Sequence, residues 1–314
     1  MNESPERSLI DVVESIRTME GGGFPVRRPF PNPRVDFIDP FLLIDEMGPV
    51  DWPPGAAIGA PDHPHRGFET VTYLLKGRMR HKDSRGNVAT LNPGDVQWMT
   101  AGAGVIHSEM PEPEFQRTGG VTHGFQIWVN LPAGKKMMAP RYQDLPEAGI
   151  PKATSGDGKV RARVIAGQSM GVEAVIDTVT PIMYIHFMIE PGGELLQRVP
   201  MDHNALVYVF SGEALLGPEG VRVPEGSLAT FGAGGDVRLA AAADAPPLTP
   251  SIEANAGRPG DGEGFFPATE MLLLTGVPLN EPVERYGPFV MNTREEIVQA
   301  FEDYQNGRFG RIEG

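Results

Sequence analysis

Short apolar runs separated by glycine- and proline-rich turns recur along most of this 314-residue chain. In the run FETVTYLLKG, Val71, Tyr73 and Leu75 occupy every second position, which is the period of a β-strand. The stretches KDSRGN and NPGD supply turns before the next apolar runs, and THGFQIWVNLP has the β-branched and aromatic content of a further strand. The pattern therefore predicts a β-meander in the first half of the chain.

A second series of apolar runs begins after a polar, turn-rich segment near residues 135–158. The stretches PHRGFETVTYLLKGRMRH and MDHNALVYVFSGEALLG share a polar start with a histidine, an apolar strand and a glycine turn. Two copies of one β module would suit the length of the chain. We therefore expect an all-β protein with two domains, residues 1–145 and residues 146–314.

The segment NTREEIVQAFEDYQNGRFG near the C-terminus has the pattern of a helix rather than a strand. Asn292 or Thr293 can cap its start, acidic residues follow in the first turn, and a glycine ends it. Ile297, Phe301 and Tyr304 recur at helical spacing. We expect one face of this helix to dock on the body of the protein, at the end of the second domain in sequence.

Composition and charge exclude several classes of function. The chain has no cysteine, so disulfides, thiolate metal sites and a cysteine nucleophile are absent. Acids exceed bases by 41 to 27 with no broad basic stripe, which argues against direct nucleic-acid binding. No apolar run is long enough for a membrane helix, and the polar N-terminal segment lacks the apolar core of a secretory signal. We expect a cytoplasmic protein.

Two pairs of metal-binding side chains stand at strand-like spacing. His63 and His65 lie two residues apart, as do His107 and Glu109, so each pair can face one side of a strand. Imidazole nitrogen suits Fe, Mn, Ni, Cu or Zn, and three histidines with one carboxylate leave positions open for water or substrate. Glu69 has the parity of the first pair on an uninterrupted strand, so spacing alone leaves Glu69 and Glu109 as rival ligands.

The other histidines are expected to be structural. We expect His81, beside the KDSRGN turn, to be solvated or to bond within that turn. His123 heads a strand, and His186 lies in the apolar run MYIHFMIEPG, so both are expected to be satisfied structural side chains. His203 stands where a metal site would need two histidines, and we expect it to be a hydrogen-bonded polar group.

Several long motifs together closely resemble the pirin family, in the same order along the chain. They are HPHRGFETVTYLLKGRMRHKDSRGN, PGDVQWMTAGAGVIHSE, HGFQIWVNLP and PLNEPVERYGPFVMNTREEIVQAFEDYQNGRFG. The resemblance covers nearly the whole chain from FPVRRPFP onward. It implies two stacked cupin (jelly-roll-like) β-barrels with a C-terminal helix.

The resemblance also implies a ligand set. Pirins hold one metal, usually iron, in the N-terminal barrel, at positions that correspond here to His63, His65, His107 and Glu109. Glu69, which a general cupin pattern would use, is then a neighbour of the site. The implied cofactor is one divalent transition metal, Fe(II) first, with Mn, Ni, Cu, Zn or Co as alternatives. The C-terminal barrel is expected to hold no metal.

Two functions from different classes follow from the resemblance. Some pirins resemble quercetinases, so the chain is expected to be a dioxygenase that acts with O₂ on flavonol-type aromatic enols such as quercetin. Glu109 would be the catalytic base in that reaction. Other pirins are similar to regulators, so the alternative is a non-enzymatic, redox-sensing protein that modulates a transcription factor or a metabolic enzyme through direct protein contact.

Overall fold

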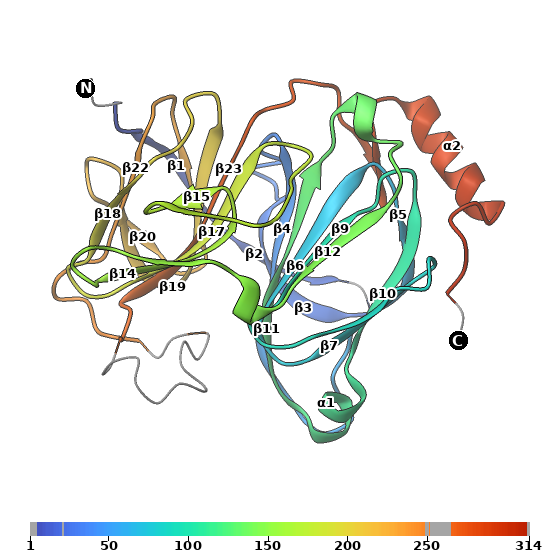
Figure 1. The fold of residues 1–314 in the computed structure, drawn as a ribbon, viewed down its shortest axis with the longest axis horizontal. Coiled ribbons are helices and arrows are strands. Elements are labelled where there is room, and N and C mark those ends of the chain that lie inside the picture. Colours follow the sequence, from blue (N-terminus) through green and yellow to red (C-terminus); the bar gives the residue numbers. More distant parts are fainter. Residues whose placement is uncertain (1–4, 21, 249–250, 252–264, 313–314) are drawn as a thin grey trace. The chain divides into compact units, whose positions relative to one another are not determined.

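The computed structural model describes residues 5–20, 22–248, 251 and 265–312, and its contacts divide the chain into two units (Figure 1). Unit 1 contains the chain up to Ser15 together with Ala148–Pro278, and unit 2 contains Ile16–Glu147 together with the chain from Leu279 onward. The internal boundary falls close to the predicted junction between residues 145 and 146. Each terminal segment, however, belongs to the unit that the other half of the chain forms, unlike in the predicted division.

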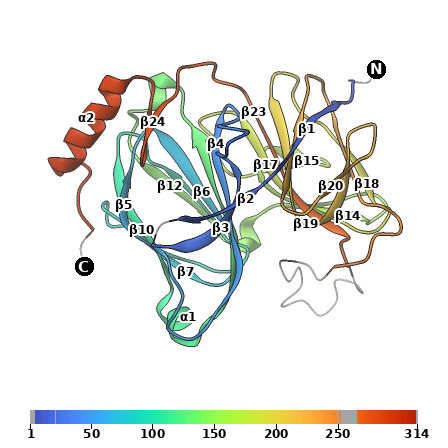
Figure 2. The ribbon, with the colours of Figure 1, turned by 180° about the vertical axis from the view of Figure 1, so that it is seen from behind.

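Strand pairing over long sequence distances explains why each terminal segment joins the unit formed by the other half of the chain. β1 (Leu9–Glu14) pairs antiparallel with β21 (Ser227–Phe231), so the N-terminal segment completes one edge of the unit 1 sheet (Figure 2). At the other end of the chain, Phe289 forms a parallel bridge with Arg66 of unit 2. Backbone groups of both terminal segments thus find their hydrogen-bond partners in the unit that each segment joins.

Unit 1 is organised around a ten-stranded sheet with the order β1-β21-β19-β23-β17-β14-β13, to which β18, β20 and β22 are joined. The central strands β17 and β23 are mainly apolar and are buried along their whole length, including His186 and Glu270. The strands not yet given are β13 (Lys152–Thr154), β14 (Val160–Ala166), β15 (Gln168–Ser169), β16 (Val172–Glu173), β17 (Ile182–Ile189), β18 (Glu194–Gln197), β19 (Asn204–Leu216), β20 (Val221–Pro224), β22 (Val237–Ala240) and β23 (Thr269–Gly276).

Unit 2 contains a seven-stranded sheet with the order β12-β9-β6-β11-β4-β3-β2 and a four-stranded sheet with the order β5-β10-β7-β8. A two-stranded hairpin, β24-β25, comes from the C-terminal segment. The strands are β2 (Ile16–Glu20), β3 (Phe24–Phe30), β4 (Phe41–Trp52), β5 (Ala60–His65), β6 (Phe68–Lys76), β7 (Met79–Asp83), β8 (Val88–Leu91), β9 (Val96–Thr100), β10 (Val105–Pro111), β11 (Gly120–Asn130), β12 (Arg141–Leu145), β24 (Glu284–Tyr286) and β25 (Phe289–Met291).

The strands predicted from the apolar runs are confirmed, and so is the all-β class. KDSRGN joins β7 to β8, and NPGD joins β8 to β9 with Gly94 in the left-handed region at φ 91°. In β6 every residue except Lys76 is buried, so the strand is covered on both faces. β6 therefore lies in the interior of its sheet, between β9 and β11.

The C-terminal helix begins and ends as its sequence predicts. α2 (Arg294–Gln305) has Thr293 as its N-cap, in a reciprocal capping box with Glu296. Ile297 is buried, Phe301 packs against the same apolar cluster, and the 37% exposed Tyr304 contacts the rings of Phe289 and Phe309, so the predicted face docks. The helix belongs to unit 2, whereas the predicted division placed it at the end of the C-terminal domain.

Three short helical segments were not predicted. α1 (Pro113–Thr118) begins with a proline, and the carboxylate of Glu112 accepts hydrogen bonds from the backbone of its first turn. The other two are 3₁₀ turns, η1 (Ala133–Lys135) and η2 (Glu147–Gly149). Among the described residues, neither α1 nor α2 is long and apolar enough to cross a membrane.

Candidate metal centre

The two predicted pairs of metal-binding residues lie on neighbouring strands of the four-stranded sheet in unit 2. β5 carries His63 and His65, and β10 carries His107 and Glu109. The strands are antiparallel, and their register sets His107 directly opposite His63. Because side chains two residues apart share a face, both pairs project from the same side of the sheet. The pairing of β5 with β10 thus brings the two predicted pairs to neighbouring positions.

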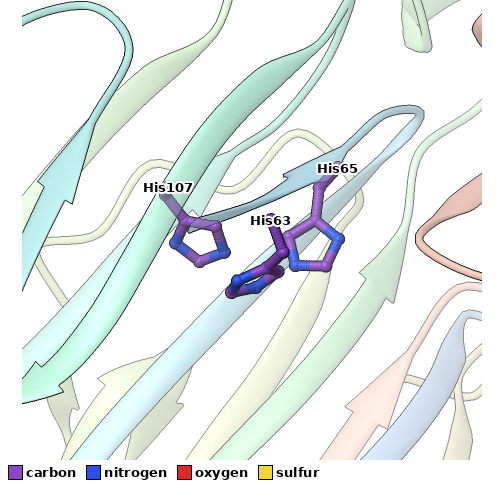
Figure 3. A group of neighbouring side chains, drawn as sticks. All are labelled: His63, His65 and His107. Carbon is purple, nitrogen blue, oxygen red and sulfur yellow. The ribbon is translucent and has the colours of Figure 1, made fainter. Parts of the chain in front are cut away.

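The three histidines converge on one point, as Figure 3 shows. Each offers a ring nitrogen, and these nitrogens all lie within 4.8 Å of one another. The ring centroids are separated by 4.3 Å for His63 and His107, 4.7 Å for His63 and His65, and 4.9 Å for His65 and His107. Such a cluster of neutral imidazoles is a ligand set for a transition metal.

Hydrogen bonds at the Nδ1 atoms of His63 and His65 determine which nitrogen of each ring faces the centre of the cluster. The Nδ1 atoms of His63 and His65 lie 2.7 Å from the carbonyl of Pro61 and 3.3 Å from that of Pro288, respectively. A carbonyl oxygen can accept but not donate, so both Nδ1 atoms carry the proton. The Nε2 atoms of both residues are thereby left with a lone pair for a metal, the usual arrangement of a ligating histidine.

The third ligand is held by another histidine. His107 Nδ1 lies 3.0 Å from Nε2 of His81, a residue that is 1% exposed. The prediction that His81 is solvated or bonds within its turn is wrong. His81 lies on β7, which pairs with β10 and sets His81 opposite Glu109. This long-range pairing cannot be predicted from the local sequence. It brings His81 within hydrogen-bonding distance of His107.

The structure fits a metal at this point. His107 Nε2 is buried and has no hydrogen-bond partner among the described residues, although buried polar atoms are normally paired. Burial and then the neighbouring histidines lower the pKa of both His65 and His107 well below the usual range. The rings are therefore neutral near pH 7, as metal ligands must be, and a bound cation would satisfy the orphaned nitrogen.

Glu109 lies on β10, two residues after His107, and two other side chains hold its carboxylate. One carboxylate oxygen accepts a hydrogen bond from Thr72 at 2.8 Å, and the other accepts one from Gln126 Nε2 at 3.2 Å. Its oxygens do not belong to the group of three nitrogens described above. Its role as fourth ligand therefore stays a prediction.

Glu69, the rival carboxylate, lies elsewhere. The chain is interrupted after His65 at Gly67, which has φ 91° and so close an approach to Val290 that an added Cβ would lie 1.9 Å from its carbonyl oxygen. The turn ends β5, and Glu69 is the second residue of β6 in the other sheet, so the parity argument fails. Glu69 is fully buried and accepts a hydrogen bond from Thr100 at 2.6 Å.

His63 and His65 line a cavity of about 700 Å³ whose lining residues all belong to unit 2. Cavities of this size hold small organic ligands. Part of the lining is apolar and aromatic, and it includes Phe24, Leu42, Leu43, Met47 and Trp128. The polar part includes Glu109, Gln126, Asp45 and Arg28. The hairpin β24-β25 contributes the rim residue Tyr286, which is 70% exposed.

The remaining histidines are bonded to buried or half-buried polar groups, as predicted. His123 Nε2 lies 3.0 Å from Glu46, and His186 Nε2 lies 3.0 Å from Glu270. His203 Nδ1 lies 2.9 Å from the hydroxyl of Thr275 in unit 1.

Two β-sheet units, one of which carries a three-histidine cluster over a cavity, define a two-domain protein of the cupin class. The model of the Pirin family matches residues 23–129, and that of the Pirin C-terminal cupin domain matches residues 262–310. Pirin of Homo sapiens is 40% identical over 302 residues, which cover 95% of this chain and 92% of that protein. A Pirin-like protein of Solanum lycopersicum is 41% identical over 98% of this chain and 94% of its own length. The chain belongs to the pirin family.

Solved structures agree with this assignment. A quercetin 2,3-dioxygenase from Acinetobacter baumannii superimposes with a TM-score of 0.84 and 35% identity, over 98% of this chain and 100% of that chain. A bacterial pirin from Escherichia coli in complex with nickel(II) shares the fold, with a TM-score of 0.58 at 16% identity over 85% of this chain and 99% of that chain. Pirins are thus similar to this chain over both units.

Proposed function

We propose that this protein is a metal-dependent dioxygenase that uses O₂ to open the central ring of flavonol-type aromatic enols such as quercetin. The observation that carries the proposal is the convergence of His63, His65 and His107 on one point, where His63, His65 and Glu109 line a largely apolar cavity. The similarity to the Acinetobacter quercetin 2,3-dioxygenase supports it, because that similarity extends over both units at 35% identity.

The metal would be held by the Nε2 atoms of His63, His65 and His107, with Glu109 as the fourth ligand. A bound Fe(II), or Mn, Ni, Cu, Zn or Co in its place, would supply a Lewis-acidic centre with open positions for an oxygen donor. The chain itself supplies the orientation of the ligands, since three outward nitrogens are bonded to Pro61, Pro288 and His81.

Glu109 is also the proposed base. Its carboxylate lines the cavity, where it can accept the proton of a substrate hydroxyl. Hydrogen bonds from Thr72 and Gln126 hold both oxygens in place. The apolar walls, among them Leu43 and Trp128, would pack against the flat ring system and exclude water from it.

An aerobic turnover assay tests the enzyme proposal. Iron-loaded protein is incubated with quercetin, and loss of the flavonol absorbance is followed against the His63→Ala variant. The proposal expects turnover by the wild type and a rate at the background level for the variant. A wild-type rate no faster than that of the variant would contradict the enzyme proposal.

Metal analysis tests the ligand set separately. Elemental analysis of purified protein is expected to find about one transition metal per chain, and His107→Ala is expected to lose most of it. Full metal content in the His107→Ala variant would contradict the ligand set. The matched control is His123→Ala, because His123 is bonded to Glu46 and is no part of the cluster.

A regulatory function is the second candidate, and one feature of the site favours it. Arg66 directly follows His65, and its guanidinium donates a hydrogen bond to Asp303 of α2 at 2.8 Å. His65 itself is bonded to the C-terminal hairpin at Pro288. A change of metal charge would therefore act on side chains connected to a surface helix, which a protein partner could contact. A cytoplasmic pull-down that finds no metal-dependent interactor would count against this candidate.

A further inference from the structure

A second polar cluster lies in the wall of the same cavity, apart from the histidines. Arg28 donates hydrogen bonds to both carboxylate oxygens of Asp45, from Nε at 2.7 Å and from Nη2 at 2.6 Å, and Nη2 also donates to Glu20. All three residues line the cavity. The Asp45 side chain is 6% exposed and the Arg28 side chain 13%, so the pair faces the cavity rather than open solvent.

The register of the seven-stranded sheet connects this cluster to Glu109. Thr72 of β6 pairs with Gln126 of β11, and Gln126 pairs with Asp45 of β4, so these side chains lie on one face of the sheet. Thr72 and Gln126 bond Glu109, and Asp45 bonds Arg28 of β3. With neighbouring strands about 4.8 Å apart, the row from Gln126 to Arg28 spans roughly 10 Å. That span can accommodate one aromatic ring of a flavonol between the two polar clusters.

The cluster of Arg28, Asp45 and Glu20 can donate and accept further hydrogen bonds. Among the described residues, the hydrogen bonds of Arg28 use Nε and Nη2, and none uses Nη1. A carboxylate offers about four lone-pair positions, and Arg28 occupies two of those on Asp45. Burial raises the pKa of Asp45 to about 6 against the opposing effect of Arg28, so further donated hydrogen bonds would stabilise the ionised carboxylate.

The charges of the cluster indicate what kind of group it would accept. One guanidinium and two carboxylates carry a formal net charge of −1, so an additional anion would be repelled. A neutral hydroxyl, by contrast, can accept from Arg28 Nη1 and donate to Asp45 at once. Apolar and aromatic residues, including Leu43 and Trp128, line the cavity beside the two polar clusters and suit the body of an aromatic molecule.

We infer that Asp45 and Arg28 form a distal binding site for hydroxyl groups on the 2-phenyl ring of a flavonol-type substrate, the remote ring, whose central-ring hydroxyl faces Glu109. The inference rests on the proposed function and narrows its substrate class. The preferred substrates are flat polyphenols that carry neutral hydroxyl groups on a remote ring. Analogues with a bare or carboxylated remote ring are disfavoured.

A binding series tests this without catalytic turnover. Zinc-loaded protein, in which the metal does not change oxidation state, is titrated with quercetin, with galangin, which lacks hydroxyls on the remote ring, and with a flavonol carrying a carboxylate on that ring. Quenching of tryptophan fluorescence reports binding, since Trp128 lines the cavity. Hydrogen bonds to charged groups predict that quercetin binds about tenfold more tightly than galangin, and that the carboxylated analogue binds more weakly than galangin.

Two substitutions assign the preference to the cluster. In Asp45→Asn the preference for quercetin is expected to fall to about twofold, while the affinity for galangin is kept. Arg28→Lys, which loses the paired geometry but not the charge, is expected to give an intermediate preference. The control is Glu114→Gln, which removes one charge from an exposed ion pair with Arg117 on α1. It should match the wild type.

The outcomes separate this inference from the enzyme proposal. Equal affinities for quercetin and galangin in the wild type would overturn the distal site, as would tighter binding of the carboxylated analogue or a preference that survives in a folded Asp45→Asn variant. Should the variants fail to fold, the wild-type series decides alone. A clear preference in the zinc form, with no turnover in the iron form, would uphold the distal site and overturn the enzyme proposal.

Discussion

Nε2 of His81 and Nδ1 of His107 lie 3.0 Å apart, and both rings are almost fully buried. If His107 binds a metal through Nε2, its Nδ1 must carry the proton and donate it to His81. His81 is then the acceptor that fixes both the tautomer and the ring orientation of the ligand. Its own Nδ1 has no hydrogen-bond partner among the described residues, so His81 is held mainly by packing and by His107.

Replacing His81 should therefore weaken metal binding without removing a ligand. His81→Leu leaves the buried N–H of His107 without an acceptor, and we expect the metal affinity to fall about 10- to 100-fold. His81→Gln can place an amide oxygen near the former Nε2 position and should keep the affinity within a few-fold. Zinc competition against a chromophoric chelator measures both variants. Equal affinities for the leucine variant and the wild type would show that His81 does not position His107.

The hydroxyl of Thr72 provides a second test, directed at Glu109 rather than at the histidines. Thr72→Val has nearly the same shape but removes the hydroxyl that bonds the Glu109 carboxylate and lies 2.9 Å from Oε1 of Gln126. We expect the turnover rate on quercetin to fall about tenfold, with the metal content and the KM little changed, because a hydrogen bond to a charged group is lost. The control is Thr70→Val, since Thr70 lies two residues away on the same face of β6 and makes no bond to Glu109. A similar loss of rate in both variants would point to a packing effect.

The sequence predicted the histidine pairs because their chemistry depends on local parity within a strand. His63 and His65 share a face whatever the rest of the fold does, and so do His107 and Glu109. Glu69 is separated from the face of His63 and His65 by the backbone conformation of Gly67. The left-handed turn at Gly67 ends β5, so the alternation of side chains does not continue into β6. Glycine at that position was visible in the sequence, but its conformation was not.

Other features depended on contacts between distant segments. The pairing of β1 with β21 moves the N-terminal segment into unit 1, and no local pattern around Leu9–Glu14 specifies that partner. The pairing of β7 with β10 likewise brings His81 to His107. α1, by contrast, could have been predicted from the local sequence. Glu112 followed by Pro113 is a helix-start signal, because a capping carboxylate is followed by proline at the first helical position.

Lys136 predicts an unusual pH dependence of stability. Its buried ammonium donates hydrogen bonds to the carbonyls of Gly67 and Val290 and to the side chain of Asn130, at 2.8, 3.1 and 2.6 Å. Burial lowers the pKa of Lys136 from 10.5 to about 8. Between these two values the unfolded chain binds more protons than the folded one, so the free energy of unfolding should rise with pH. The expected rise from this group between pH 8 and pH 10 is about 2 kcal/mol.

Denaturant unfolding at pH 8 and pH 10 measures the effect of Lys136 by difference. Lys136→Met is expected to lose the pH-dependent contribution, whereas Lys135→Met, at the exposed neighbouring position, should retain it. The relevant quantity is the change in unfolding free energy between the two pH values, compared among the three proteins. If Lys136→Met shows the same change as the wild type, the lysine is not the group responsible.

Arg66 connects the ligand strand to the C-terminal helix, and its removal should destabilise unit 2. Arg66 is 3% exposed, and its guanidinium donates to Asp303 at 2.8 Å and to the carbonyl of Ala103 at 2.7 Å and lies 4.6 Å from the ring centroid of Phe309. Arg66→Met keeps much of the apolar volume but leaves the Asp303 carboxylate, 6% exposed, without its buried partner. Breaking a buried ion pair from one side costs about 3 kcal/mol, which we expect as the loss of unfolding free energy.

The double variant Arg66→Met/Asp303→Asn distinguishes a lost charge pair from lost packing. Removing the second charge also removes the penalty of an unpaired buried carboxylate, so the double variant should be more stable than Arg66→Met alone. Limited proteolysis adds a local measurement, because weaker docking of α2 should expose the C-terminal segment to cleavage before the sheets of unit 2. A double variant less stable than the single one would show that Asp303 acts mainly through its bonds to Gln299 and Arg308, at 2.9 and 2.6 Å, and that Arg66 is not its decisive partner.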